Sequence, residues 1–389
     1  MSDKKSNLFL RIIKSIFKWV LYIIILINIF ILGSGKLYLY KTIWYNLPTI
    51  HDNNKFEERI IHAGTPQEFP NTDDYCKTAV PSLLSETLEK LKSVAFLVII
   101  DDSVRYEKYW DGYGKASLTN SFSMAKTVVS ILIGIAIDEG KIKSVDEPVA
   151  DFLPQFKEGM GQKLTIKHLL TMSSGLNWNE SYINPLSITT EAYYGTNIPK
   201  LVASLKVVDE PGKIWKYLSG NTLVLAAILE KATGMKVSNY ATEKLWKPLG
   251  ANNDAQWSLD KKEGEEKAYC CIYSNARDFA RIGELYLHHG NWNGKQIISE
   301  DYVNNSIKPA DLKDDEGNNI DHYGYAWWLI NVKGHKVFYA RGILGQYVFV
   351  IPDKKMVAVR LGNKRGQVKG KFIYTDIEAY IEGVLEMYP

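Results

Sequence analysis

Cysteine is scarce in this sequence. Its 389 residues include three cysteines, Cys76, Cys270 and Cys271, of which the last two are adjacent. An adjacent pair rarely forms a bridge, and three thiols cannot build a disulfide framework. Their spacing also differs from that of a metal-binding cluster. We therefore expect all three cysteines to be structural residues, and the sequence predicts no metal site.

The sequence also lacks the motifs that identify several other classes of enzyme. It has no G-x-S-x-G elbow and no H-E-x-x-H pair. His288 and His289 stand before Gly290 at the end of an expected helix, where a capping role is favoured. A phosphate-binding glycine loop is absent, so no cofactor is expected. The formal net charge of +3 falls further without the N-terminal basic cluster, which argues against nucleic acid as a partner.

A long apolar run stands near the N-terminus. It covers residues 19–32 with one interruption at Asn28, and extending it over residues 16–34 gives enough length to span a bilayer. Basic residues precede it at five positions: Lys4, Lys5, Arg11, Lys14 and Lys18. Only Lys36 and Lys41 follow it closely, so the positive-inside bias predicts a cytoplasmic N-terminus and an extracytoplasmic body.

Residues 1–35 are therefore predicted to be a cytoplasmic stub and a single transmembrane anchor, with the membrane as a partner. A cleaved signal peptide is the alternative, because a run this short suits such a segment and Gly33-Ser34-Gly35 is small enough for cleavage. A soluble buried helix is disfavoured because the run has no polar face. Either of the first two interpretations exports the rest of the chain, to the cell surface, the periplasm or the medium.

The rest of the chain divides into an arm and one large domain. Residues 36–81 carry Pro48, Pro66 and Pro70 without a sustained hydrophobic period, which is typical of an extended linker or a surface-wrapping arm. The domain comprises residues 82–389, with strands expected near both of its ends. A hairpin is predicted over residues 94–110, and further strands over 325–331, 336–340, 347–351 and 356–361.

The predicted helices lie mostly between these strands. An apolar helix is expected over residues 123–139, closed by Gly140 and buried nearly all round. Other helices are predicted over residues 82–92, 166–171, 222–232, 276–287 and 375–387. Strands at both ends with helices between them indicate an α/β (α+β) fold, in which one sheet is assembled from distant segments and a mostly helical region is inserted in its middle.

The pattern Ser-x-x-Lys is the first candidate for chemistry. It puts a hydroxyl and an amine one helical turn apart on the same face, where a neutral amine can take the serine proton. The sequence contains it four times, at Ser2, Ser15, Ser123 and Ser258. Only Ser123 opens a long apolar helix, whose N-terminus favours negative charge and whose surroundings disfavour a charged Lys126. A capping serine followed by a chance lysine is the alternative.

Two further segments are candidates. Tyr217 and Ser219 follow a Pro-Gly turn and precede an expected helix, so a phenol held on a short rigid loop can relay a proton to a leaving group. Ala340-Arg341-Gly342-Ile343 lies between two late strands, where a glycine allows another chain to approach the backbone and a backbone N–H to polarise a carbonyl. Core packing of the tyrosine and a bulge at the glycine are the alternatives.

Taken in order, these segments resemble a known family. The motifs are Ser123-Met124-Ala125-Lys126, Leu169-Leu170-Thr171-Met172-Ser173-Ser174-Gly175-Leu176, Pro211-Gly212 and Tyr217-x-Ser219. They resemble the serine β-lactamase and penicillin-binding protein superfamily, in its class C-related branch of esterases, peptidases and amidases. Further motifs are most similar to 6-aminohexanoate-oligomer hydrolases: Arg277-Asp278-Phe279-Ala280-Arg281-Ile282-Gly283, Tyr323-Gly324-Tyr325-Ala326-Trp327-Trp328 and Gly345-Gln346.

The resemblance implies a β-lactamase-like antiparallel sheet flanked by helices, and it implies roles for particular residues. Ser123 would form an acyl-enzyme, while Lys126 and Tyr217 would share the acid and base work. Ser219 would help to hold the proton network, and the strand at Gly342 would bring the N–H of Ile343 to an oxyanion hole shared with the Ser123 N–H. Where the family has Lys-Thr-Gly or His-x-Gly, this chain has Ala340-Arg341-Gly342, which puts recognition of a substrate carboxylate in doubt.

Two functions are compatible with these residues. The first is an exported serine hydrolase that cleaves a small amide or ester substrate. The second is a binding or sensor module that keeps the fold and acylates without useful turnover. The presence of serine, lysine, tyrosine and a glycine-containing strand together favours the enzyme.

Overall fold

A six-stranded antiparallel sheet forms one layer of the molecule. This computed structural model describes residues 2–370 and 372–389. The strand order in the sheet is β3-β2-β12-β11-β10-β9. The strands are β2 (Ser93–Ile100), β3 (Ser103–Tyr109), β9 (Trp328–Val332), β10 (His335–Gly342), β11 (Gln346–Ile351) and β12 (Met356–Gly362). Strands from the two ends of the domain therefore pair in one sheet, as the sequence predicts.

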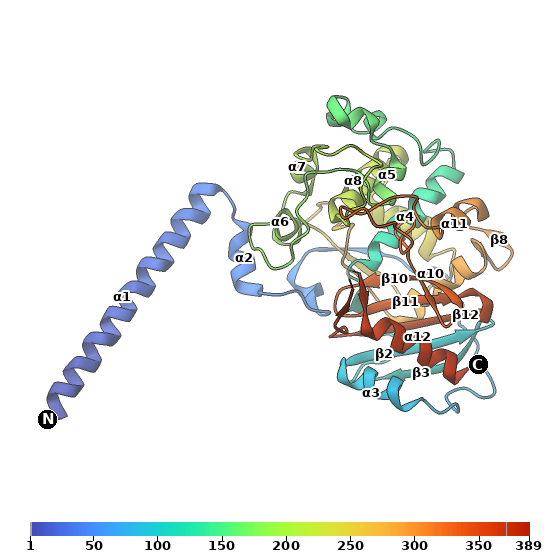
Figure 1. The fold of residues 1–389 in the computed structure, drawn as a ribbon, viewed down its shortest axis with the longest axis horizontal. Coiled ribbons are helices and arrows are strands. Elements are labelled where there is room, and N and C mark those ends of the chain that lie inside the picture. Colours follow the sequence, from blue (N-terminus) through green and yellow to red (C-terminus); the bar gives the residue numbers. More distant parts are fainter. Residues whose placement is uncertain (1, 371) are drawn as a thin grey trace.

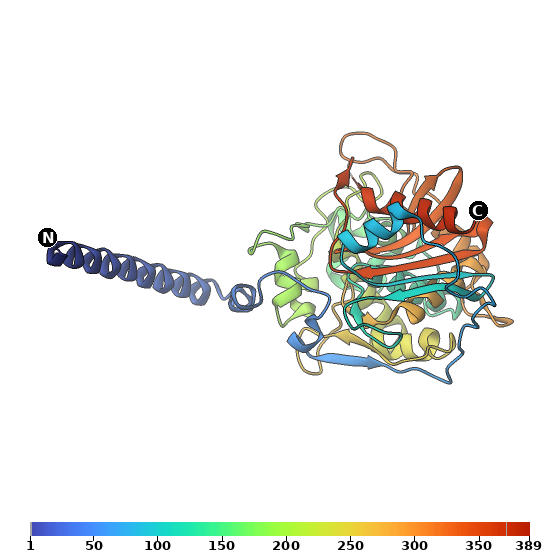
Figure 2. The ribbon, with the colours of Figure 1, turned by 90° about the horizontal axis from the view of Figure 1, so that it is seen from below.

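Helices cover both faces of this sheet (Figures 1 and 2). α3 (Ser82–Lys90) and α12 (Thr375–Met387) pack on one face, and α10 (Ala276–Leu287) packs on the other. The central strands are apolar runs because both of their faces are buried. α10 approaches closely at Gly283, where an added Cβ would lie 2.8 Å from a methyl of Val357. The predicted architecture is confirmed.

The inserted region is mostly helical. α4 (Met124–Asp138) is buried continuously from Met124 to Ala136, as its apolar composition predicts. α5 (Ile166–Leu170), α6 (Ile188–Tyr194), α7 (Ile198–Ala203), α8 (Ser219–Thr233), α9 (Val237–Ala241) and α11 (Glu300–Ser306) complete it. α8 begins three residues before the predicted start at 222, so Ser219 stands on its first turn and the expectation of a loop there is wrong. An added Cβ at Gly220 would lie 2.5 Å from the Trp178 ring, so glycine at this position allows Trp178 to pack against the first turn of α8.

A second, four-stranded sheet was not predicted. Its order is β1-β5-β6-β4, formed by β1 (Glu58–Ile61), β5 (Ala255–Ser258), β6 (Ile272–Ser274) and β4 (Thr119–Asn120). Strands this short give no detectable period-2 pattern. β1 belongs to the arm at residues 36–81, which also forms α2 (Tyr38–Tyr45) and wraps the body. The arm therefore contributes a strand to this second sheet.

Strand β9 of the first sheet begins at Trp328, later than the predicted start at residue 325. Ala326 takes a left-handed φ of 60°, which interrupts the extended backbone there.

The adjacent cysteines depart from the sequence prediction. Cys270 and Cys271 form a disulfide, and both are buried. The expectation that adjacent cysteines stay unbridged is therefore wrong for this pair. Cys271 takes a left-handed φ of 72° in the turn before β6, a local conformation that composition and spacing do not reveal. Cys76 remains a free thiol.

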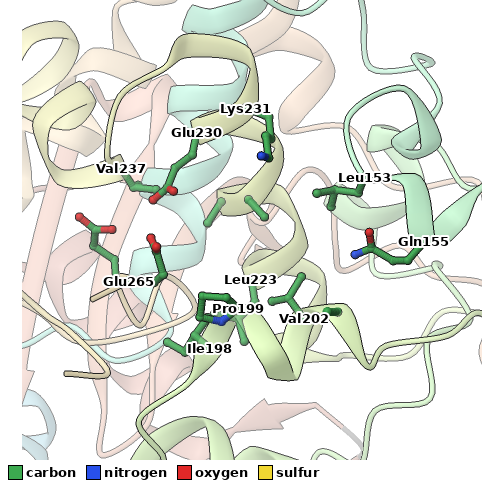
Figure 3. A pocket seen from close by; sticks show the side chains of 14 residues that line it. Leu153, Gln155, Ile198, Pro199, Val202, Leu223, Glu230, Lys231, Val237 and Glu265 are labelled. Atoms are coloured by element: carbon green, nitrogen blue, oxygen red, sulfur yellow. The ribbon is translucent and has the colours of Figure 1, made fainter. Parts of the chain in front are cut away.

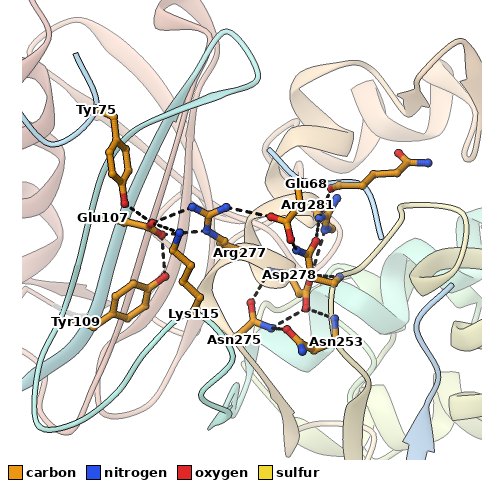
Figure 4. A network of polar contacts seen from close by, with 12 residues as sticks. Glu68, Tyr75, Glu107, Tyr109, Lys115, Asn253, Asn275, Arg277, Asp278 and Arg281 are labelled. Carbon is orange, nitrogen blue, oxygen red and sulfur yellow. Dashed lines mark hydrogen bonds and ion pairs between the residues drawn. The ribbon is translucent and has the colours of Figure 1, made fainter. Parts of the chain in front are cut away.

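A buried ionic network holds α10 against β3 and the arm (Figure 4). Arg277 donates two hydrogen bonds to the carboxylate of Glu107, at 2.8 and 3.0 Å. The hydroxyls of Tyr75 and Tyr109 donate to the same carboxylate. Burial acts to raise the pKa of Glu107, but the hydrogen bonds from Arg277 and Tyr75 outweigh it and lower that pKa to about 2. The contact between Arg277 and Glu107 thus joins α10 to β3.

Glu107 makes the free energy of unfolding depend on pH in the acidic range. Its folded-state pKa lies below the ordinary value of 4.5, so its contribution to the free energy of unfolding is complete above pH 4.5 and is lost as pH falls toward 2. The full contribution is on the order of 3 kcal/mol. We predict that Glu107→Gln lowers the unfolding temperature at pH 7 and flattens its dependence on pH between 5 and 3, measured by calorimetry in detergent. An unchanged pH dependence in the variant would contradict this assignment.

Candidate active site

Ser123 stands at the N-terminus of α4, just after the short strand β4. Phe122 before it takes a left-handed φ of 44°. The side-chain oxygen of Asn120 accepts a hydrogen bond from the Phe122 N–H at 2.9 Å, which holds this turn. Left-handed backbone at a bulky residue is costly and is found where a site requires it. The turn leaves Ser123 facing a cavity of about 530 Å³.

Lys126 lies one helical turn after Ser123. Its side chain is 1% exposed, and Nζ lies 3.0 Å from Ser123 Oγ and 2.9 Å from the carbonyl oxygen of Tyr269. Neither partner is a carboxylate. The Ser123 hydroxyl and the Lys126 amine are therefore at the distance that proton transfer between them requires.

Tyr217 lies on the other side of this lysine. The Lys126 Nζ is 5.1 Å from the centroid of the Tyr217 ring. The tyrosine precedes α8, and its ring is fixed by packing against Tyr323 and Trp328. The structure therefore brings together the three residues that the sequence singles out, Ser123, Lys126 and Tyr217, although they come from distant positions in the chain. The three other Ser-x-x-Lys serines are not among the residues that line this cavity.

The segment Gly342-Ile343 lies beside Ser123. An added Cβ at Gly342 would lie 2.2 Å from the carbonyl oxygen of Ser121, so only glycine allows β10 to approach the turn at residues 121–122. Ile343 follows directly and lines the cavity together with Ser123. Neither the Ser123 N–H nor the Ile343 N–H donates a hydrogen bond within the part of the chain that the structure describes. Both donors are available at this end of the cavity.

Glu180 is the residue that the sequence analysis missed. Its carboxylate accepts hydrogen bonds from the Ser219 N–H and the Ser219 hydroxyl, both at 2.6 Å, and from the Tyr182 hydroxyl at 2.5 Å. Ser219 therefore donates to Glu180 and not to Lys126 or Tyr217. Burial, followed by the nearby Glu180 carboxylate, raises the pKa of Tyr269 well above its usual value. A carboxylate 39 residues before its partner gives no local sequence signal.

The cavity walls come from seven separate segments of the chain. The residues that line it are Thr42, Asn46, Leu47, Pro48, Phe122, Ser123, Tyr182, Ile183, Pro185, Thr189, Thr190, Tyr193, Tyr194, Ser219, Tyr269, Cys270, Ile343, Leu344 and Arg365. Arg365 is the one charged residue among them. Arg341 is not in the lining, because its guanidinium packs 3.4 Å from the Trp328 ring centroid and donates to the Phe372 carbonyl oxygen.

Other ionisable clusters lie away from Ser123. A second cavity of about 420 Å³ contains Glu230, Glu265 and Glu266 (Figure 3), and the Lys236 ammonium already bonds to two of these carboxylates. Burial, then Glu265, raises the pKa of Glu230 to about 8. Asp102, Glu284 and His288 form the other group with metal-ligand spacing among the described residues. None of these residues lines the Ser123 cavity.

Comparison with known proteins agrees with this geometry. The family model described as Beta-lactamase matches residues 80–378. The chain is 27% identical over 316 residues to 6-aminohexanoate-dimer hydrolase of Paenarthrobacter ureafaciens, covering 77% of this chain and 79% of that protein. It is 30% identical over 142 residues to Esterase EstB of Burkholderia gladioli, covering 33% of this chain and 36% of the esterase.

Solved structures show the same fold. A putative 6-aminohexanoate-dimer hydrolase from Bacillus anthracis superposes with a TM-score of 0.73 at 22% identity, covering 87% of this chain and 91% of that chain. A family VIII carboxylesterase superposes with a TM-score of 0.63 at 17% identity, covering 85% and 100%. The sheet and the helices, α4 among them, therefore belong to a fold that these proteins share.

Glu180 should position the first turn of α8. Glu180→Gln keeps the shape of the side chain but replaces the charged carboxylate that accepts hydrogen bonds from the Ser219 N–H and hydroxyl. A charge-assisted hydrogen bond contributes about 1.5–3 kcal/mol. We predict that kcat/KM for a p-nitrophenyl ester falls about 10- to 100-fold. The control is Glu210→Gln, which removes a carboxylate from an exposed pair with Lys163. Equal activity of the Glu180 and Glu210 variants would exclude a positioning role for Glu180.

Proposed function

The chain belongs to the β-lactamase family and is a serine hydrolase, and we propose that it cleaves small amides or esters through an acyl-enzyme on Ser123. The observation that carries this proposal is the 3.0 Å contact between Ser123 Oγ, which lines the cavity, and the buried Lys126 Nζ. A hydroxyl paired in this way with an amine at a helix N-terminus is the arrangement that nucleophilic catalysis needs. The names of two relatives, a 6-aminohexanoate-dimer hydrolase and an esterase, are consistent with it.

The proposed reaction has two halves. Ser123 Oγ attacks the substrate carbonyl carbon while its proton passes to Lys126 Nζ, and the N–H groups of Ser123 and Ile343 stabilise the negative charge on the carbonyl oxygen. When the tetrahedral intermediate collapses, the bond to the leaving amine or alcohol breaks, and the leaving group receives the proton through Tyr217. A water molecule then attacks the acyl-enzyme, with the same groups accepting its proton, and releases the carboxylic acid and free Ser123.

The proposed substrate has a neutral or weakly charged acyl group. Ala340 supplies no cation at the strand position where the family pattern has lysine or histidine, and the guanidinium of Arg341 packs on the Trp328 ring. Charge-assisted pairing to a carboxylate is worth about 1.5–3 kcal/mol, so its loss at this position disfavours β-lactams relative to short esters and small amides. Arg365 remains as a cation elsewhere in the lining.

We further propose that the enzyme is anchored in a membrane. The stretch Phe9–Ser34 of α1 (Ser2–Ser34) is long and apolar enough to cross a membrane or to be a signal sequence. The basic residues before the apolar run at residues 19–32 favour a cytoplasmic N-terminus. In this arrangement residues 1–35 are the stub and anchor, residues 36–81 are the arm, and residues 82–389 are the extracytoplasmic catalytic domain.

The function is tested with the full chain in detergent. We expect steady turnover of p-nitrophenyl butyrate and labelling by an active-site fluorophosphonate, both lost in Ser123→Ala, because the variant has no nucleophile. The matched control is Ser258→Ala, which removes the hydroxyl of a Ser-x-x-Lys serine outside the cavity. Labelling that survives Ser123→Ala in a folded protein contradicts the nucleophile. Labelling of the wild type without turnover would favour the binding or sensor module.

Orientation has a separate test. If the N-terminus is cytoplasmic, protease added to intact spheroplasts should digest the domain beyond Gly35 while a cytoplasmic marker protein survives. The protein should also fractionate with membranes, since a cleaved signal would release it. Full protection of the domain in intact spheroplasts contradicts this orientation, and recovery of the domain in the soluble fraction favours cleavage.

A further inference from the structure

The short helix α2 lies beside the end of α1. The Tyr40 hydroxyl donates to the side-chain oxygen of Asn28 at 2.7 Å. Ile31 of α1 is 1% exposed and belongs to the same buried cluster as Tyr38 and Leu39 of α2. Because Gly35 takes a left-handed φ of 68°, the chain turns back on itself directly after α1. α2 therefore lies alongside the last turns of the apolar helix.

This contact fixes the depth of α2 relative to a membrane. Asn28 precedes the end of α1 at Ser34 by six residues, which is about 9 Å along a helix. Helices that lie on a bilayer bury their apolar face about 5–10 Å into the boundary between headgroups and acyl chains. If α1 spans the bilayer, α2 lies at that boundary.

The other end of α2 is fixed to the catalytic body. The Tyr194 hydroxyl of α6 donates to the carbonyl oxygen of Asn46 at 2.6 Å, and the rings of Tyr45 and Tyr194 stack. Figure 1 shows α2 between α1 and α6. Asn46 and Tyr194 both line the cavity that contains Ser123. α2 thus connects the apolar helix α1 to the wall of the Ser123 cavity.

Large apolar side chains are exposed around this bridge. Trp44 is 83% exposed and Ile43 64%, and on the neighbouring loop Ile183 is 89% exposed. Leu47 and Leu186 are exposed as well. Leu47 and Ile183 also line the cavity, so the apolar surface continues from α2 to the opening of the active site. Exposed apolar surface of this kind marks an interaction site, and tryptophan is enriched at the membrane–water boundary.

We infer that this surface, formed by Ile43, Trp44, Leu47, Ile183 and Leu186, rests on the bilayer, and that the Ser123 cavity opens onto the lipid headgroup layer. The inference rests on the proposed function and names its substrate class: an amphiphile held in the membrane, whose ester or amide bond lies near the headgroups. Apart from Arg365 the described lining of the cavity is uncharged, which suits an acyl chain.

The test compares a membrane-borne ester with a soluble ester. The full chain is reconstituted into phosphatidylcholine vesicles and assayed with 4-methylumbelliferyl palmitate in the bilayer and with p-nitrophenyl acetate in water. The variants are Ile43→Ser and Trp44→Ser, at positions outside the cavity lining. Leu83→Ser is the matched control, because Leu83 on α3 is 63% exposed and α3 lies away from α2, at the lower edge of the body in Figure 1.

We expect each α2 variant to lose about tenfold or more of the rate on the vesicle-borne ester, since each removes a large apolar contact with lipid. The rate on p-nitrophenyl acetate should stay within about twofold, and Leu83→Ser should leave both rates unchanged. Equal loss on both esters, no loss on either, or a wild type that hydrolyses only the soluble ester would each overturn the inference. A wild type that hydrolyses neither ester contradicts the proposed function itself.

A second measurement reports contact without relying on activity. Trp44→Cys in a Cys76→Ser background carries one free thiol, because Cys270 and Cys271 are bridged. An environment-sensitive fluorophore on residue 44 should be quenched by lipids that carry a spin label near the headgroup, and the same label on Leu83→Cys should not be quenched. Equal quenching at the two positions would overturn the inference.

Discussion

The hydrogen bonds of one buried amine hold the active site together. Lys126 Nζ contacts Ser123 on its own helix and the carbonyl oxygen of Tyr269 in the segment before β6, and it faces the ring of Tyr217. A buried amine is costly unless its hydrogen bonds are made. The helix α4, the turn before β6 and the start of α8 must therefore meet at this point. The disulfide beside Tyr269 and the Glu180 carboxylate under Ser219 fix two of these three segments.

Close approach of backbone to backbone is the second constraint. β10 can reach the turn before Ser123 only because residue 342 lacks a side chain. That contact brings the Ile343 N–H and the Ser123 N–H to one end of the cavity, which is the arrangement that the proposed oxyanion hole requires. In the sequence the glycine suggests room for a substrate, whereas in the structure the chain's own turn at residues 121–122 fills that room.

The N-terminal segments connect this chemistry to a place in the cell. The arm contributes α2 and β1 to the folded body, and four of its residues, Thr42, Asn46, Leu47 and Pro48, form one wall of the cavity. A proposed membrane anchor and a proposed lipid-facing opening are thus parts of one continuous segment. This coupling gives a physical reason for an apolar helix next to a hydrolase: it holds the cavity at the depth where amphiphiles carry their ester and amide bonds.

The sequence by itself determined the sheet of distant strands, the buried helix after Ser123 and the contact between Ser123 and Lys126, which is the proposed nucleophilic pair. Those features are local: an apolar period, a helix start, and a spacing of one turn between Ser123 and Lys126. Tertiary structure alone decided which groups meet them. Glu180, the Tyr269 carbonyl, Arg365 and the second sheet come from positions without a local pattern, and the bridge between Cys270 and Cys271 depends on a backbone conformation that only the packed turn imposes. Contacts between side chains that are far apart in the chain produce no periodic pattern in the sequence, so the sequence does not predict them.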